Sequence, residues 1–178
     1  MIFERTKLPG VFLVRAEPKP DPRGEFARTF CADEFRAHGL DPRVAQSSTS
    51  VTRRRGTLRG MHWQAAPWGE SKLVRCVRGS VFDVAVDLRR DSPSYRGWVA
   101  FELRASGRDA LYLPEGVAHG YQSLEDDVEL LYQMSVPYHP EAGRGVRWND
   151  PAFGIAWPIA DPLLSERDAS FPDFDPTR

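Results

Sequence analysis

Glycine and proline divide this chain into short elements from end to end. There are 14 glycines and 15 prolines among its 178 residues. Proline breaks helix interiors and is kept out of central strands, so each one marks the edge of an element. Between these breaks lie runs of β-forming residues, at 10–16, 25–30, 72–77, 80–88, 98–103, 110–114, 128–136 and 145–149. Several short strands at this spacing predict an antiparallel sandwich or barrel.

The segment KLVRCVRGSVFDVAVDL at 72–88 predicts a β-hairpin, with Gly79 in its tight turn. In its second half, positions 82, 84, 86 and 88 are all apolar, whereas Asp83 and Asp87 fall on the other face. We therefore expect the apolar set to face the core. One segment, CADEFRAHGL at 31–40, predicts a helix, and Gly39 suits the C′ position that ends it.

The composition predicts one soluble domain over residues 1–178. No linker, repeat or low-complexity tract divides the chain, and its length suffices to bury a sizeable core. Lys and Arg total 24 against 25 Asp and Glu, so no net charge draws it to nucleic acid or to an acidic membrane. The charged start MIFERTKLPG is unlike a signal peptide, and no run reaches the roughly 18 apolar residues of a membrane span. We expect a cytoplasmic protein with a surface tail at about 174–178.

The histidines and cysteines do not have metal-ligand spacing. The four histidines, His38, His62, His119 and His139, are scattered, as are Cys31 and Cys76. His62 lies in TLRGMHWQ, where glycine and glutamine occupy the alternate positions 60 and 64. A site needs at least three ligands, so we expect no metal ion. The familiar phosphate loops are absent as well, so any phosphate would be held by side chains such as Arg23, Arg59 and Arg167.

The chemistry of His62 alone leaves two interpretations open. A histidine titrates near neutral pH and can remove a proton, especially where a carboxylate fixes its tautomer. It can equally be a core histidine whose ring nitrogens are satisfied. No GxSxG motif or reactive-cysteine pattern is present, so activation of a nucleophile is disfavoured. The arginines are similarly ambiguous, because each, including the triplet at 53–55, is compatible with a solvated surface ion pair.

Six blocks of sequence, taken in order, carry a family resemblance. They are DPRGEFARTF, QSSTSVTRRRGTLRGMHWQ, KLVRCVRGSVFDVAVDLRRDSPSY, LYLPEGVAHGYQSLEDD, RGVRWNDPAFGIAWP and LLSERD. Over about residues 8–173 the chain resembles the dTDP-4-dehydrorhamnose 3,5-epimerase family. The resemblance implies an all-β fold, a cupin-type jelly roll (double-stranded β-helix) with a few short helices. It also implies an enzyme that works without a metal or an organic cofactor.

The resemblance implies a role for each of four residues. In that family a base removes a proton beside the C4 ketone of a nucleotide-linked 4-keto-6-deoxyhexose, an enolate forms, and a proton returns on the opposite face. His62 matches the base, and Asp168 matches the carboxylate that orients it. Lys72 matches the lysine that stabilises charge on the C4 oxygen, and Tyr138 the tyrosine that returns the proton. Taken singly, the lysine could be an edge charge and the tyrosine a packing residue.

The family's substrate-binding positions carry over as well. They are Arg23, Phe26, Gln46, Ser48, Arg59, His119 and Arg167. Arg59 and Arg167 match positions that hold the diphosphate of a dTDP-linked substrate. Arg23 and Phe26 match a segment that reaches the site of the neighbouring subunit, so the resemblance implies a homodimer with a shared active site. We expect Asp83 to lie beneath the pocket, because it shares a strand face with other polar positions.

Four positions depart from the family pattern. Ser48 replaces a usual asparagine, Glu70 a frequent glutamine, Pro137 a common aromatic residue, and Trp63 a tyrosine or phenylalanine. Serine is shorter than an amide, so the contact of Ser48 is expected through water or not at all. These departures leave open the sugar, the nucleotide and whether C3, C5 or both are epimerised. The alternatives are a 3- or 5-monoepimerase, a ketoisomerase, and a non-catalytic sugar-nucleotide-binding barrel.

Overall fold

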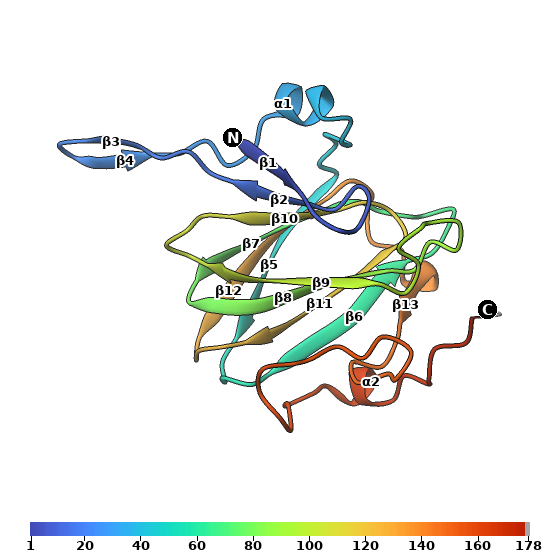
Figure 1. Cartoon of the computed structure of the whole chain (residues 1–178). Helices are drawn as coiled ribbons and strands as arrows, with labels where there is room; N and C mark the ends of the chain where they lie inside the picture. Colours follow the sequence, from blue (N-terminus) through green and yellow to red (C-terminus); the bar gives the residue numbers. More distant parts are fainter. Residues whose placement is uncertain (177–178) are drawn as a thin grey trace.

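The computed structural model describes residues 1–176, which form two antiparallel sheets packed face to face (Figure 1). The larger sheet contains, in spatial order, β1 (Ile2–Arg5), β2 (Phe12–Arg15), β10 (Ala110–Leu113), β7 (Lys72–Arg78), β12 (Val128–Met134) and β5 (Gln46–Thr52). The smaller contains β13 (Gly143–Gly145), β6 (Leu58–Gln64), β11 (Val117–Ser123), β8 (Ser80–Asp87) and β9 (Trp98–Arg104). The other elements are β3 (Lys19–Asp21), β4 (Gly24–Phe26), α1 (Ala32–Ala37), the 3₁₀ turn η1 (Pro140–Ala142) and α2 (Glu166–Ala169). The all-β prediction is confirmed.

The main core lies between the two sheets. The larger sheet contributes Leu13, Val74, Leu111 and Leu130, and the smaller contributes Val81, Ala85, Leu103 and Tyr121. All are fully or almost fully buried. Removing one such side chain from water contributes about 1.5–3 kcal/mol, so this layer is the principal stabilising element of the sandwich. Among the described residues, no helix is long and apolar enough to cross a bilayer.

The two strands predicted at 72–88 are present as β7 and β8, but the predicted hairpin is wrong: β7 pairs with β10 and β12 in the larger sheet and β8 with β11 and β9 in the smaller, so the turn between them crosses from one sheet to the other. Gly79 occupies the turn with φ of 75°, a conformation that side chains with a Cβ disfavour. The apolar set predicted to face the core packs instead outside the two-sheet core, with Val84 and Val86 buried and Phe82 and Leu88 partly buried. Val84 and Val86 pack on the outer face of the smaller sheet against Val146 and Phe153. Both faces of β8 are therefore buried, and the inner face includes Asp83 together with apolar residues.

The C-terminal segment covers this outer face of the smaller sheet (Figure 1). Trp63 of β6 packs in the same cluster, together with Trp157 and Phe174. The ring of Phe174 lies 5.1 Å from that of Phe153, and its backbone N–H donates to the Asp150 carboxylate at 2.5 Å. Within the segment expected as a surface tail, the partly buried Phe174 ring packs in this outer cluster; positions 177–178 lie outside the described residues.

The larger sheet is covered on its own outer face by α1 (Figure 1). Phe35 is buried there against Phe12 and Tyr112, and the helix ends as predicted, with Gly39 at φ of 72°. The preceding hairpin, β3 and β4, projects from the body of the molecule, and all its residues are exposed. The strand expected at 25–30 stops at Phe26, and the strand expected at 145–149 is replaced by β13 at 143–145.

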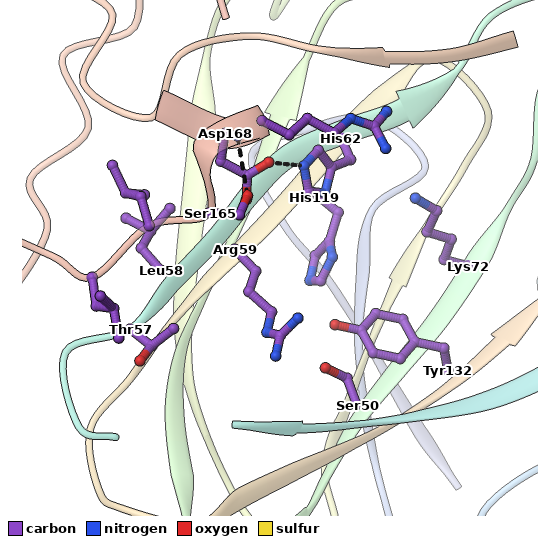
Figure 2. A pocket seen from close by; sticks show the side chains of 13 residues that line it. Ser50, Thr57, Leu58, Arg59, His62, Lys72, His119, Tyr132, Ser165 and Asp168 are labelled. Atoms are coloured by element: carbon purple, nitrogen blue, oxygen red, sulfur yellow. Dashed lines mark hydrogen bonds and ion pairs between the residues drawn. The ribbon is translucent and has the colours of Figure 1, made fainter. Parts of the chain in front are cut away.

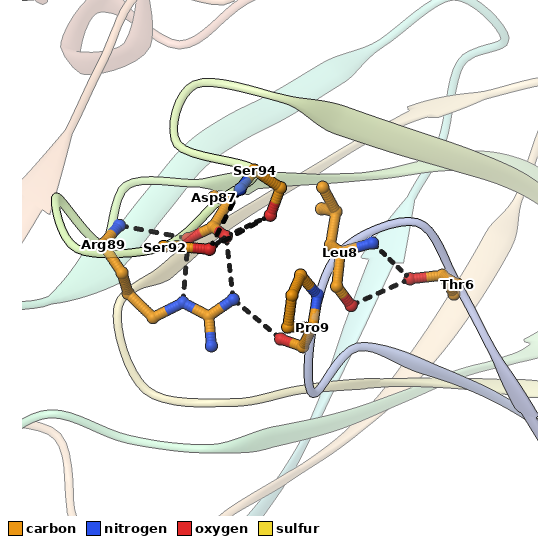
Figure 3. A network of polar contacts seen from close by, with 7 residues as sticks. All are labelled: Thr6, Leu8, Pro9, Asp87, Arg89, Ser92 and Ser94. Carbon is orange, nitrogen blue, oxygen red and sulfur yellow. Dashed lines mark hydrogen bonds and ion pairs between the residues drawn. The ribbon is translucent and has the colours of Figure 1, made fainter.

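A buried carboxylate fixes the loop after β8 (Figure 3). Asp87 accepts hydrogen bonds from the Arg89 guanidinium at 2.8 Å and from the hydroxyls of Ser92 and Ser94 at 2.5 and 2.6 Å. Arg89 also donates to the carbonyl of Pro9, which ties the loop to the N-terminal segment. Burial raises the pKa of Asp87, but these hydrogen bonds outweigh it and bring the pKa to about 2.

Candidate active site

A cavity of about 570 Å³ opens between the sheets, and Figure 2 shows the side chains that line it. Its walls come from β5, β6, β7, β11 and β12 and from the segment that ends in α2. A second cavity of about 240 Å³ adjoins it, and the two share His62, Lys72, Tyr132 and Arg167. We describe them together as the substrate groove. Most of the residues singled out from the sequence line this groove.

His62 and Asp168 form a hydrogen-bonded pair at one wall of the groove. The Nε2 of His62 lies 2.6 Å from the Oδ1 of Asp168 (Figure 2). Asp168 sits in the first turn of α2, where its backbone N–H donates to the N-cap hydroxyl of Ser165 at 3.1 Å. Its second oxygen accepts from the backbone N–H of Gly60 at 3.3 Å. The short helix therefore aims this carboxylate at the histidine of β6.

The electrostatics of this pair suit a histidine that gains a proton. The side chain of Asp168 is 5% exposed and that of His62 is 38% exposed. Burial alone raises the pKa of Asp168. The hydrogen bond and charge of His62, together with the hydrogen bonds from Gly60 and Ser165, lower the pKa by more than burial raises it, so the net shift is downward. Asp168 thus stays ionised and can stabilise an imidazolium, while the exposed edge of His62 is open to a ligand.

A second histidine–aspartate pair lies deeper. His119 of β11 is the cross-strand neighbour of His62, and its Nε2 lies 2.9 Å from the Oδ2 of Asp83 on β8. The two side chains are 5% and 0% exposed. Burial raises the pKa of Asp83, and the charge and hydrogen bond of His119 oppose that rise. Asp83 therefore lies beneath the groove, as the alternation of residues along the strand predicted.

Lys72 occupies the opposite wall, at the start of β7 (Figure 2). Its Nζ lies 3.0 Å from the Oε1 of Glu70. A cation at this point faces the histidine of the other sheet across the groove. The arrangement brings together a histidine oriented by a carboxylate and an ammonium that can stabilise a developing oxyanion, which is what removal of a proton next to a carbonyl requires.

Comparisons with known proteins agree with this geometry. The family model for dTDP-4-dehydrorhamnose 3,5-epimerase matches residues 5–176. The chain belongs to this family. The dTDP-4-dehydrorhamnose 3,5-epimerase of Sinorhizobium fredii is 41% identical over 173 residues, covering 97% of this chain and 89% of that protein.

Two solved structures of family members are closely similar. One is a 4-keto-6-deoxy sugar epimerase from the novobiocin biosynthetic gene cluster of Streptomyces spheroides, with a TM-score of 0.92 and 40% identity, covering 97% of this chain and 87% of that one. The other is a 3′-monoepimerase from Streptomyces bikiniensis, a histidine-to-asparagine, tyrosine-to-phenylalanine double variant in complex with dTDP. Its TM-score is 0.88 at 37% identity, covering 95% of this chain and 85% of that one. The chain is thus an isomerase-class epimerase with the cupin-type jelly roll of its family.

One groove residue of this epimerase was missed in the sequence. Tyr132 of β12 lies opposite Ser48 of β5, and its hydroxyl points into the groove (Figure 2). Burial raises the pKa of Tyr132 well above its usual value, with smaller contributions from Tyr121 and Asp83, while Arg59 opposes the rise. In the apolar run VELLYQMSV the tyrosine resembles a core residue. The available signal was its strand alternation, which puts it on the inward face with Leu130.

Tyr138, the tyrosine that the resemblance singled out, lies at the mouth of the smaller cavity. Its side chain is exposed, while its backbone N–H donates to the Gln46 side chain at 2.7 Å. The contact of Gln46 in this structure is thus with the backbone of Tyr138. Ser48 lines the smaller cavity beside it.

The predicted arginines divide into two groups. Arg59 and Arg167 line the larger cavity, and Arg59 also donates to the Thr52 hydroxyl at 3.1 Å. Arg23 lies on the projecting hairpin, where it pairs with Asp21, and Phe26 is exposed on the same hairpin. The fold of the single chain therefore does not bring Arg23 or Phe26 to the groove. Among the described residues, no three side chains of His, Cys, Asp or Glu converge as a metal site requires.

Proposed function

We propose that this chain is a cofactor-independent epimerase of a dTDP-linked 4-keto-6-deoxyhexose, of the dTDP-4-dehydro-6-deoxyglucose 3,5-epimerase type. The observation that carries the proposal is the His62–Asp168 pair facing Lys72 across one groove. We further propose that one domain over residues 1–178 carries this activity, and that it acts in the cytoplasm. A non-catalytic binding barrel would need no carboxylate-oriented base opposite a cation.

The proposed mechanism moves one proton at a time. His62 takes the proton from C3 or C5 of the sugar, and the electrons of that C–H bond move into the enolate, with negative charge on the C4 oxygen. Asp168 stabilises the imidazolium. Lys72 donates a hydrogen bond to the C4 oxygen without giving up its proton. A tyrosine on the other face then protonates the carbon, which inverts its configuration.

We assign this last step to Tyr132 ahead of Tyr138. The Tyr132 hydroxyl points into the groove, and its raised pKa keeps the phenol protonated until a strongly basic carbon forms beside it. In the double variant from Streptomyces bikiniensis, the replaced tyrosine lies as many positions after the replaced histidine as Tyr132 lies after His62. Tyr138 is held by its backbone at the mouth of the groove and is the alternative acid.

Substrate binding follows from the charges of the groove. Arg59 and Arg167 suit a diphosphate because guanidinium groups bind phosphate oxygens in a bidentate manner. We propose that the projecting hairpin carries Arg23 and Phe26 into the groove of a partner subunit, so that the active unit is a homodimer. The support is that this hairpin is fully exposed and extends away from its own body (Figure 1). A monomeric mass in solution at working concentration would contradict the homodimer.

The test of the function is deuterium incorporation from D₂O into a panel of nucleotide-linked 4-keto-6-deoxyhexoses. We expect exchange at C3, at C5 or at both, with formation of the epimer. A folded protein that exchanges no member of the panel contradicts the proposal. Exchange confined to C3 would favour the second candidate, a 3-monoepimerase, which the similarity to the Streptomyces bikiniensis enzyme supports. A carbonyl moved from C4 to C3 would identify a ketoisomerase.

The two tyrosines can be separated in the same assay. Tyr132→Phe removes the proposed acid but leaves the base, so we expect exchange with little inversion, because His62 returns deuterium to the face from which it took the proton. Epimer formation should fall by about 10²–10⁴, the usual contribution of a general acid or base. Tyr138→Phe is the matched variant and should keep epimer formation. The reverse pattern would assign the acid to Tyr138.

A further inference from the structure

The ion pair between Lys72 and Glu70 is nearly enclosed. The two side chains are 13% and 9% exposed, and their charged atoms are 3.0 Å apart. Both line the smaller cavity of the substrate groove, beside Tyr132 and Tyr138. Glu70 therefore lies next to the cation that the proposed mechanism uses.

The other oxygen of Glu70 is also held. Its Oε2 lies 3.3 Å from the Nε2 of Gln64, a buried residue at the end of β6. Gln64 is itself fixed, because its Oε1 accepts from the backbone N–H of His139 at 2.6 Å and its Nε2 lies 3.2 Å from the carbonyl of Pro137. Glu70 thus holds Lys72 from a rigid position that is tied to the segment carrying Tyr138.

The groove around Lys72 carries an excess of cations. The charged and titratable side chains that line the two cavities are Arg59 and His62 of β6, His119 of β11, Tyr132 of β12, Tyr138, Arg144 of β13, Arg167 and Asp168 of α2, and Glu70. The strand neighbours of Lys72, Met134 and Leu113, are apolar. Asp168 is paired with His62, so Glu70 is the carboxylate placed to offset the arginines at Lys72. Like charges and enclosure both disfavour an ammonium, and an adjacent carboxylate favours it.

We propose that Glu70 is a positioning residue that keeps Lys72 charged and aimed into the groove, and so extends the alkaline range in which the enzyme works. The inference rests on the proposed function, in which Lys72 donates to the C4 oxygen of the enolate. Glu70 does not exchange a proton during the reaction.

The charge of Lys72 can be followed directly by NMR, because the sequence contains three lysines, Lys7, Lys19 and Lys72. Lysine labelled with ¹³C at Cε gives three NMR signals, and Lys72→Arg identifies the one from Lys72. In Glu70→Gln we expect the Lys72 signal to titrate at lower pH than in the unmodified protein, because the adjacent opposite charge is gone. The signals of Lys7 and Lys19 should not move.

The Glu70→Gln variant also tests the effect of Glu70 on the pH dependence of exchange. Glutamine has nearly the size and shape of glutamate, so Glu70→Gln should fold and remain measurable in the exchange assay. Its alkaline limb should move down by the same interval as the NMR titration, with little change in KM, and Glu70→Asp should restore part of it. Glu129→Gln, which removes a carboxylate 3.8 Å from Arg78 outside the groove, is the matched charge control and should change neither readout.

The possible results distinguish the proposed role of Glu70 from the proposed function of the enzyme. An unmoved Lys72 titration in folded Glu70→Gln overturns the role of Glu70, whatever the activity. A titration that moves without any change in the alkaline limb overturns its catalytic part. Absence of exchange by the unmodified protein contradicts the proposed function instead, and the NMR titration is then still a test of whether Glu70 controls the charge of Lys72.

Discussion

Two histidine–aspartate pairs lie side by side in this molecule, and they differ in almost everything except their chemistry. His62 and His119 are direct cross-strand neighbours on β6 and β11. Each places its Nε2 within 3 Å of a carboxylate, at 2.6 Å from Asp168 and 2.9 Å from Asp83. Both histidines line the groove, but the His62 side chain is 38% exposed, whereas those of His119 and Asp83 are 5% and 0% exposed.

The origin of each carboxylate explains the difference. Asp83 comes from β8, the strand next to β11, so the sheet itself encloses the pair. Asp168 comes from α2, which reaches β6 from outside the sheet and leaves one edge of His62 exposed. The pKa shifts follow: burial dominates at Asp83 and raises its pKa, whereas hydrogen bonds dominate at Asp168 and lower it. A base needs access as well as an orienting carboxylate, and His62 is much more exposed than His119.

The largest expected difference between the two histidine–aspartate pairs is in catalytic activity. His62→Asn should lower the rate of deuterium exchange by about 10²–10⁴, because an amide cannot act as a general base. Binding of dTDP should persist, since the arginines that suit the diphosphate are untouched. The measurement is exchange by NMR together with dTDP titration by calorimetry.

His119→Asn is the matched control for this experiment. It should cause a smaller loss of exchange, because the His119 ring is buried and bonded to Asp83. Equal losses for the two variants would mean that burial does not decide which histidine is the base. Unchanged exchange in His62→Asn would remove it from the assigned role.

Stability should show the reverse order. His119→Ala leaves the Asp83 carboxylate buried without its partner, which typically costs about 3–5 kcal/mol. His62→Ala should cost about 1 kcal/mol, because Asp168 keeps its hydrogen bond from Gly60 and the exposed site admits water. Urea unfolding of both variants measures the difference. Equal free energies of unfolding would contradict the distinction between a buried pair and an accessible one.

The sequence predicted the apolar strands well and the groove strands poorly, for one physical reason. β7 and β8 were recognised because they are rich in apolar residues, which pack in the core between the sheets and in the clusters on the outer faces. β5, β6 and β11 were not recognised from β-forming runs, since their inner positions hold groove residues such as Ser50, His62 and His119. A binding site built on a sheet interrupts the apolar alternation that identifies a strand.

The same reason explains which groove residues were found. His62, Lys72 and Asp168 were identified from the family's motifs, whereas Tyr132 resembled a core residue because it sits in an apolar run. The distance between His62 and Asp168 could not be predicted, because it depends on how the C-terminal segment folds back over the smaller sheet.

The smallest expected difference between the two pairs is in the pH dependence of stability, to which the two aspartates should contribute in opposite directions. An unfolded aspartate titrates near about pH 3.9. Because the folded pKa of Asp168 is lowered, its contribution is fully present above that pH and is lost as the pH falls through the folded pKa. Because the folded pKa of Asp83 is raised, its contribution is greatest below about pH 3.9 and declines as the pH rises toward the folded pKa.

Asn substitutions at the two positions should therefore change the slope of the unfolding free energy with opposite signs. Asp168→Asn should flatten the loss of stability below about pH 4, and Asp83→Asn should remove a decline above about pH 4. Each effect is bounded by one proton, about 1.4 kcal/mol per pH unit. The absolute stabilities also reflect lost hydrogen bonds, so the slopes are the quantity to compare, measured by urea unfolding from about pH 3 to 7. Slopes that change in the same direction would mean that burial dominates at both carboxylates, and the two pairs would then differ in access alone.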